Sequence, residues 1–185
     1  VMISLVLTAS SLANLTANAR SAAVLDSATW GQILDKGKIY LDTGLYDRAI
    51  AYFQDVVMRY PNFPDANYCL GFVYYKKGDM KSAEEVFKKT IEIDPTFIEA
   101  YYYLGVIEYA KGNGEQVIEY LDKVTALDPN FQTAYYNKGI TLLELNRPKE
   151  AVKEFAYALY LFPRDVLSLT GIVKAYQKLD LIKNG

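Results

Sequence analysis

The sequence predicts an all-α protein, a solenoid that stacks one helix–turn–helix unit repeatedly on itself. Two series of residues recur at a step of 34, and the first is Pro61, Pro95, Pro129 and Pro163. The second series is Gly37, Gly71, Gly105 and Gly139. Between these markers, apolar residues fall at helical spacing, as at Leu70, Val73 and Tyr74. A fixed period with no insertion over four copies indicates a repeat array rather than ordinary domains.

The period divides the chain into four copies, and each copy is expected to fold as two helices joined by a turn. The copies span residues 30–63, 64–97, 98–131 and 132–165. In the second copy the first helix is expected over 65–77. The second helix is expected to end near Ile93, because Pro95 disfavours its continuation. One pair of helices cannot bury both of its faces, so neighbouring copies are expected to stack.

Two further positions in each copy predict how the paired helices pack. A small residue recurs in the second helix at Ala49, Ala83 and Ala151, and Val117 takes its place in the third copy. A large apolar residue recurs four positions later, at Phe53, Phe87, Leu121 and Phe155. The small residue lets the two helices approach closely, and the large residue fills the gap beside them. Because valine is bulkier than alanine, looser packing is expected in the third copy.

Local signals mark the ends of several helices. Asp79 and Asn113 are predicted N-caps, because a short side-chain oxygen can accept the free amide hydrogens of the next helix. Pro148 is expected in the first turn of its helix, where a missing N–H costs little. Glu84 and Lys88 are four residues apart and are expected to form an ion pair on a solvated helix face.

Residues 1–29 do not belong to the repeat and are rich in apolar and small residues. One interpretation is an apolar N-terminal helix that docks in a groove of the protein. The other is the remnant of a secretory signal over residues 1–19, because 17–19 resemble a small-residue cleavage site. No Lys or Arg precedes the apolar run, and the run is shorter than the ~20 residues of a membrane span. The compartment is cytoplasmic in the first case, and exported or periplasmic in the second.

Residues 166–185 contain half of a fifth copy. Leu169, Ile172, Val173 and Tyr176 recur at helical spacing and fit the positions of a first helix. The segment is expected to form a C-terminal helix that caps the last repeat. The alternative is that the chain is cut within a longer array.

The composition argues against several classes of function. The chain has no histidine, which removes the commonest general base and the commonest metal ligand. Its 20 basic and 22 acidic residues give a net charge of −2 and no basic face for nucleic acid. Cys69 is the single cysteine, and it is expected to lie within a first helix and to act there as a small packing residue. We therefore expect no catalytic residue, no metal site, no cofactor and no nucleic-acid partner, and the protein is not expected to be an enzyme.

The anchor residues of the copies resemble a known family. The second copy carries Leu70, Gly71, Tyr74, Gly78, Ala83, Phe87 and Pro95. This set, at a spacing of 34 residues, is similar to the signature of the tetratricopeptide repeat (TPR) family. The resemblance implies a right-handed α-solenoid of four full repeats followed by a C-terminal half repeat. Lys36 and Lys138 depart from the pattern, since they stand where the second and third copies have leucine.

The resemblance also implies a concave groove lined by fixed positions of the first helices. The fifth position of each copy holds Leu34, Tyr68, Tyr102 and Tyr136. The ninth position holds Lys38, Phe72, Val106 and Ile140. The twelfth position holds Leu41, Tyr75, Tyr109 and Leu143. An exposed apolar row of this extent marks a partner site, and tyrosine suits it because the ring and the hydroxyl both contribute. The alternative is that some of these tyrosines are buried between adjacent repeats.

These positions also bear on the kind of partner. TPR modules that bind chaperone C-termini hold the terminal carboxylate with basic and amide side chains. Only Lys38 is basic at the corresponding positions here, and Glu99 would repel a carboxylate. No chaperone C-terminal tail is therefore expected. The predicted function is a non-catalytic adaptor that binds an apolar helix or an extended peptide in a tyrosine-rich groove. The alternative is a self-assembling scaffold of an organelle- or membrane-associated complex, built through the N-terminal helix or the groove.

Overall fold

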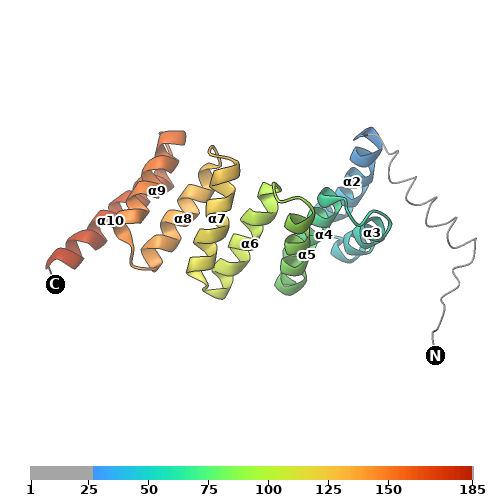
Figure 1. Ribbon diagram of the computed structural model, residues 1–185, viewed down its shortest axis with the longest axis horizontal. Coiled ribbons are helices and arrows are strands. Elements are labelled where there is room, and N and C mark those ends of the chain that lie inside the picture. Colours follow the sequence, from blue (N-terminus) through green and yellow to red (C-terminus); the bar gives the residue numbers. More distant parts are fainter. Residues whose placement is uncertain (1–26, 185) are drawn as a thin grey trace, which may run out of the picture.

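The protein is described by a computed structural model over residues 27–184, and this range is a single row of helices (Figure 1). The helices are α2 (Ser27–Asp42), α3 (Tyr46–Arg59), α4 (Pro64–Lys77), α5 (Met80–Ile93), α6 (Ile98–Lys111), α7 (Gly114–Leu127), α8 (Gln132–Glu144), α9 (Pro148–Leu161) and α10 (Val166–Asn184). The predicted apolar segment 1–29 lies outside the described residues except for 27–29, which begin α2, and the predicted signal remnant lies wholly outside them.

Helices that follow one another in the chain pack side by side, in the order α2 to α10. Figure 1 shows α2 and α10 at opposite ends of the resulting array. Helix pairs α4–α5, α6–α7 and α8–α9 make the most extensive contacts, and each pair then packs on the next. The prediction of an all-α solenoid of helix–turn–helix units is thereby confirmed. Within residues 27–184, none of the helices is long and apolar enough to cross a membrane.

Left-handed residues close the turn inside a repeat. Gly78 ends α4 with φ 87°, and its N–H donates to the carbonyl oxygens of Tyr74 and Tyr75. This backbone region is open to glycine at little cost. In the fourth copy Asn146 takes the equivalent position with φ 59°. Asparagine is one of the few other residues that tolerate this conformation.

All three predicted helix starts are found in the structure, and the side-chain cap forms at one of the two predicted N-caps. The Asp79 carboxylate accepts a hydrogen bond from the Ser82 backbone N–H at 3.1 Å, as an N-cap does. Pro148 is the first residue of α9. Asn113 is the N-cap residue of α7, as predicted, but its side chain accepts no hydrogen bond from the helix. Its Nδ2 instead donates to Glu108 Oε2 at 2.6 Å.

A half-buried lysine that forms two ion pairs replaces leucine at one departure from the repeat pattern. The Lys138 side chain is 14% exposed, and its Nζ lies 2.6 Å from Asp122 Oδ1 and 2.8 Å from Glu154 Oε1. Burial opposes the charged form, but hydrogen bonds to these two carboxylates outweigh it and raise the pKa of Lys138. The predicted ion pair between Glu84 and Lys88 also forms, with 2.7 Å between Oε1 and Nζ.

The repeat core consists of a phenyl ring held against a glycine. Phe87 and Phe155 are fully buried in the second and fourth repeats. A Cβ atom added to Gly71 would lie 2.8 Å from the Phe87 ring, and one added to Gly139 would lie 2.6 Å from the Phe155 ring. The third repeat differs, because Leu121 replaces the phenylalanine. A Cβ atom on Gly105 would meet Leu121 at 3.5 Å, an ordinary contact distance.

This difference predicts opposite effects for two identical substitutions. Gly139→Ala should lower the free energy of unfolding by about 1–3 kcal/mol, because the new methyl group collides with the Phe155 ring. Gly105→Ala should raise it by up to about 1 kcal/mol, because alanine favours the helix and meets no clash. Urea unfolding followed by circular dichroism measures both. Equal losses for the two variants would contradict the looser packing of the third repeat.

The last helix completes the core of the fourth repeat. Gly171 of α10 also lies against the Phe155 ring, since a Cβ atom added there would be 2.6 Å from it, and Ala175 is fully buried. The other face of α10 carries the apolar side chains Leu169, Val173 and Tyr176, each at least half exposed. The helix therefore covers α9 on one side and presents an uncovered apolar face on the other.

Candidate functional site

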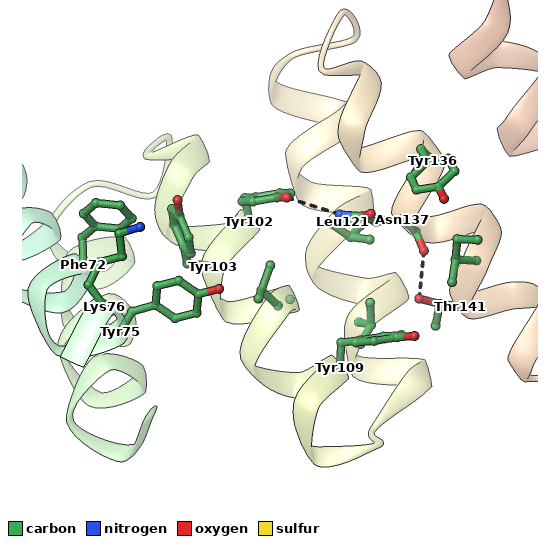
Figure 2. Close-up of a pocket in the computed structure, with 14 residues that line it drawn as sticks. Phe72, Tyr75, Lys76, Tyr102, Tyr103, Tyr109, Leu121, Tyr136, Asn137 and Thr141 are labelled. Carbon is green, nitrogen blue, oxygen red and sulfur yellow. Dashed lines mark hydrogen bonds between the residues drawn. The ribbon is translucent and has the colours of Figure 1, made fainter. Parts of the chain in front are cut away.

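A cleft of about 580 Å³ lies across three first helices, α4, α6 and α8, and reaches down to α7 (Figure 2). It is lined by Phe72, Tyr75, Lys76, Tyr102, Tyr103, Gly105, Val106, Tyr109, Val117, Leu121, Tyr136, Asn137, Ile140 and Thr141. Its volume falls within the range of about 300–1,000 Å³ that is typical of clefts that enclose ligands. We call the space lined by these residues "the cleft".

The twelve residues predicted to line a groove divide into two groups. Seven of them line the cleft: Phe72, Tyr75, Tyr102, Val106, Tyr109, Tyr136 and Ile140. The other five do not. Leu34 and Leu41 pack on the core around Phe53, and Leu143 packs on the core around Phe155. Lys38 is exposed, with its Nζ 4.0 Å from Asp35 Oδ1.

Tyr68 lies between two repeats instead of in the cleft. Its ring centroid is 5.1 Å from that of Phe97, 5.9 Å from that of Phe87 and 6.2 Å from that of Tyr103. Burial among these rings raises the pKa of the Tyr68 hydroxyl well above its usual range. Tyr68 therefore contributes to the core, which is the alternative that the sequence left open for the tyrosines.

Tyr103 joins one wall of the cleft to the core, although it was not among the predicted residues. Its ring stacks on Phe87 with centroids 5.5 Å apart, and it meets Phe72 at 5.2 Å and Tyr75 at 5.0 Å. Figure 2 shows the rings of Phe72, Tyr75 and Tyr103 grouped on one side of the cleft. Contacts of this kind fix aromatic rings in place, so this wall is preformed.

Polar groups lie on the opposite wall. Asn137 Nδ2 donates to the Tyr102 hydroxyl at 3.3 Å, and the Thr141 hydroxyl donates to the backbone carbonyl oxygen of Asn137 at 2.9 Å (Figure 2). The Tyr109 hydroxyl donates to Glu144 Oε1 at 2.6 Å, and this hydrogen bond raises the pKa of Tyr109. The Tyr102 hydroxyl accepts from Asn137 and keeps its own hydrogen to donate, and the Tyr109 oxygen can still accept, so both can hydrogen-bond to a bound main chain.

The floor of the cleft is formed where the third repeat departs from the pattern. Val117 and Leu121 of α7 stand where the other copies have alanine and phenylalanine, and both are buried beside Gly105. Leu121 does not reach as far toward Gly105 as the phenyl rings reach toward Gly71 and Gly139. The departures from the repeat pattern were the signal in the sequence that could have located this floor.

Among the described residues, Lys76 is the only cation that lines the cleft. Its Nζ lies 5.6 Å from the centroid of the Phe72 ring, a cation–π contact. Its neighbour Lys77 is paired with Asp47 at 2.7 Å. Among residues 29–180, whose side chains the structure describes, no carboxylate lies within ion-pair distance of Lys76. A positive charge without a carboxylate partner in that range therefore stands at the α4 edge of an apolar cleft.

The rest of the described chain adds no reactive centre. Within that part of the protein, no group of three His, Cys, Asp or Glu residues is placed to hold a metal ion. Cys69 is buried, and burial raises the pKa of its thiol to about 11, so the reactive thiolate is scarce near neutral pH.

An array made of stacked helix pairs, with an apolar, tyrosine-walled cleft across its first helices, defines the protein as a helical-repeat protein. The tetratricopeptide repeat family model matches residues 34–96 and 115–166, and a second tetratricopeptide repeat model matches residues 74–139. The chain therefore belongs to the tetratricopeptide repeat family. No match is found among the curated proteins.

Several solved structures share the fold. A crystal structure of MamA is 25% identical with a TM-score of 0.75, and the match covers 83% of this chain and 84% of that chain. PilF of Pseudomonas aeruginosa is 21% identical with a TM-score of 0.68, over 84% of this chain and 75% of that chain. YrrB, described as a TPR protein with an unusual peptide-binding site, is 23% identical with a TM-score of 0.66, and the match covers 86% of this chain and 85% of that chain. Membership of the tetratricopeptide repeat family supports a protein–protein interaction adaptor, and proteins of this family are typically non-catalytic scaffolds.

Proposed function

We propose that the protein is an adaptor that binds an apolar segment of a partner protein, as a helix or an extended peptide, in the cleft across α4, α6 and α8. The observation that carries the proposal is the set of tyrosine rings at the cleft surface. Tyr102 and Tyr136 are half-buried and Tyr109 is exposed, so each ring combines a fixed position with accessible apolar area. Rings held in this way bind a ligand at low cost in side-chain entropy.

The polar groups of the cleft support the same proposal. Hydroxyl groups of Tyr102 and Tyr109 and the amide of Asn137 stand beside the apolar surface. A peptide carries one N–H and one C=O at nearly every residue, and a purely apolar cleft would leave these groups without partners. A cleft with apolar walls and a few polar groups therefore suits a peptide better than a lipid chain.

The proposal is tested with a peptide selected on the wild-type protein from a phage-displayed random library. Tyr102→Ala combined with Tyr136→Ala should weaken binding of that peptide by about tenfold to a hundredfold, because aromatic residues at the centre of an interface carry much of its energy. Fluorescence anisotropy measures the affinity, and circular dichroism confirms that the variant is folded.

A second tyrosine pair gives the matched control. Tyr157 and Tyr160 lie on α9, are 40% and 76% exposed, and do not line the cleft. Their double substitution by alanine should leave the affinity unchanged. Equal affinity for the wild type and the Tyr102/Tyr136 variant would show that the cleft is not the binding site.

Self-association is the second candidate function, and the uncovered face of α10 favours it. Leu169, Val173 and Tyr176 form an exposed apolar strip at the end of the array. Such a strip can receive the end of another copy in a head-to-tail contact, which can extend into a chain. Light scattering of the protein with and without residues 1–25 tests the predicted role of the N-terminal segment. A monomeric mass for both forms would rule out self-association through that segment and through the apolar strip of α10.

A further inference from the structure

We propose that the cleft is an anchor pocket for one aromatic side chain of the partner peptide, with an acidic residue of the same peptide placed to pair with Lys76. This inference rests on the proposed function and names the chemistry of the ligand that the cleft accepts. Its basis is the third repeat, which departs from the other three at the two positions that form the floor.

The third repeat lacks a ring that the other repeats have. In the second and fourth repeats a phenyl ring presses on the glycine of the first helix, so closely that a Cβ atom there would lie within 2.8 Å of the ring. In the third repeat a Cβ atom on Gly105 would lie 3.5 Å from Leu121, an ordinary contact distance, and Leu121 lines the cleft together with Val117 and Gly105. The third repeat therefore places a shorter, branched side chain where the other repeats place a ring, and this side chain faces a cleft that a ring supplied by a partner can enter.

The walls of the cleft suit an aromatic side chain. Figure 2 shows Tyr103 on one side of the cleft and Tyr136 and Asn137 of α8 on the other, so a side chain bound in the cleft would lie between them. Tyr103 and Tyr75 meet at 57°, and Tyr102 and Tyr103 meet at 80°, so ring faces and ring edges both line the space. Aromatic rings prefer neighbours in such tilted and edge-to-face arrangements over parallel ones. An aromatic anchor therefore gains more here than an aliphatic side chain of similar area.

The charge at the edge of the cleft favours an acidic residue beside the anchor. Lys76 lines the cleft, and no carboxylate among the described side chains pairs with it, whereas Lys77, Lys111 and Lys138 all have carboxylate partners. An acidic residue of the ligand that approaches Lys76 would meet an uncompensated cation beside an aromatic face. The same group disfavours a basic residue there, so the charge contributes to selectivity as well as to affinity.

The test uses peptides that the wild-type protein selects from a phage-displayed random library. The selected sequences should share one Trp, Phe or Tyr with an Asp or Glu nearby. Replacement of that aromatic residue by alanine should weaken binding to the wild type by at least about tenfold, in line with the burial of one aromatic side chain. Lys76→Glu should reverse the preference, so that peptides with Lys or Arg in place of the acid bind better.

Filling the pocket from inside provides the complementary variant. Leu121→Phe places a ring where the other repeats have one, and should reduce the difference in affinity between the aromatic and alanine peptides to less than about twofold. Val117→Ala combined with Leu121→Phe reproduces the alanine–phenylalanine pair of the other three repeats. This double variant replaces the single one if Val117 leaves too little space for the new ring. If neither variant folds, the aromatic-to-alanine peptides and Lys76→Glu still decide the question.

The outcomes separate this inference from the proposed function. In one outcome, the peptides lose affinity for the Tyr102/Tyr136 variant, but replacement of their aromatic residue by alanine weakens binding to Leu121→Phe as much as to the wild type. This outcome would overturn the anchor pocket and leave the adaptor function in place. Selection of no peptide, or of peptides indifferent to Tyr102 and Tyr136, would overturn both.

Discussion

Replacement of Phe87 by alanine is expected to lower the free energy of unfolding by about 3–5 kcal/mol. The ring is fully buried, stacks on Tyr103 at 5.5 Å and contacts Tyr68 at 5.9 Å. Its loss leaves a cavity that the close-packed helices α4 and α5 cannot fill. Because each repeat contacts only its neighbours, this weak point in the middle of the array should also make unfolding less cooperative.

Phe162→Ala is the matched control for this substitution. Phe162 follows α9 and is 61% exposed, so its truncation should change the stability by no more than about 0.5 kcal/mol. Urea unfolding followed by both circular dichroism and tyrosine fluorescence measures the two variants. Similar losses for Phe87→Ala and Phe162→Ala would contradict the assignment of Phe87 to the core.

Replacement of Val106 by arginine should weaken binding of a selected peptide by at least about a hundredfold. Val106 lines the middle of the cleft on α6 and is partly exposed, so arginine there can reach solvent when no ligand is bound. A bound apolar segment would bury the guanidinium group without a partner, at a cost of several kcal/mol, and each 1.4 kcal/mol is about tenfold in affinity.

Val173→Arg introduces the same change outside the cleft. Val173 is 50% exposed on α10, and the variant should bind the peptide as the wild type does. Calorimetric titration of both variants, with unfolding midpoints measured alongside, separates a loss of binding from a loss of fold. Wild-type affinity in Val106→Arg would contradict the position of the binding site.

The repeat period was sufficient to predict the fold, because each unit carries its own helix and turn signals. The structure has α4 over Pro64–Lys77 and α5 ending at Ile93, close to the bounds expected from the sequence. Asn113 shows the limit of local signals. The backbone of α7 and the carboxylate of Glu108 compete for its side chain, and in the structure the side chain donates a hydrogen bond to Glu108.

The cleft was harder to predict, because its surface depends on contacts between repeats. Tyr68 and Tyr102 occupy the same position of successive repeats, yet only Tyr102 lines the cleft. The residue that faces each of them from the next repeat explains the difference. Tyr103 faces Tyr68 with a ring and helps to bury it, whereas Asn137 faces Tyr102 with a short amide and leaves its ring accessible. The repeat period gives the position of a residue within a unit, but not the size of its neighbour in the next unit.

The most direct test of binding in the cleft is amide chemical-shift mapping of the isotope-labelled protein with a selected peptide. Binding there predicts that the largest changes fall on Gly105, Val106, Tyr109, Asn137 and Ile140, which come from α6 and α8. Large changes confined to α9 and α10, with these five amides unaffected, would contradict the claim that the cleft binds the partner.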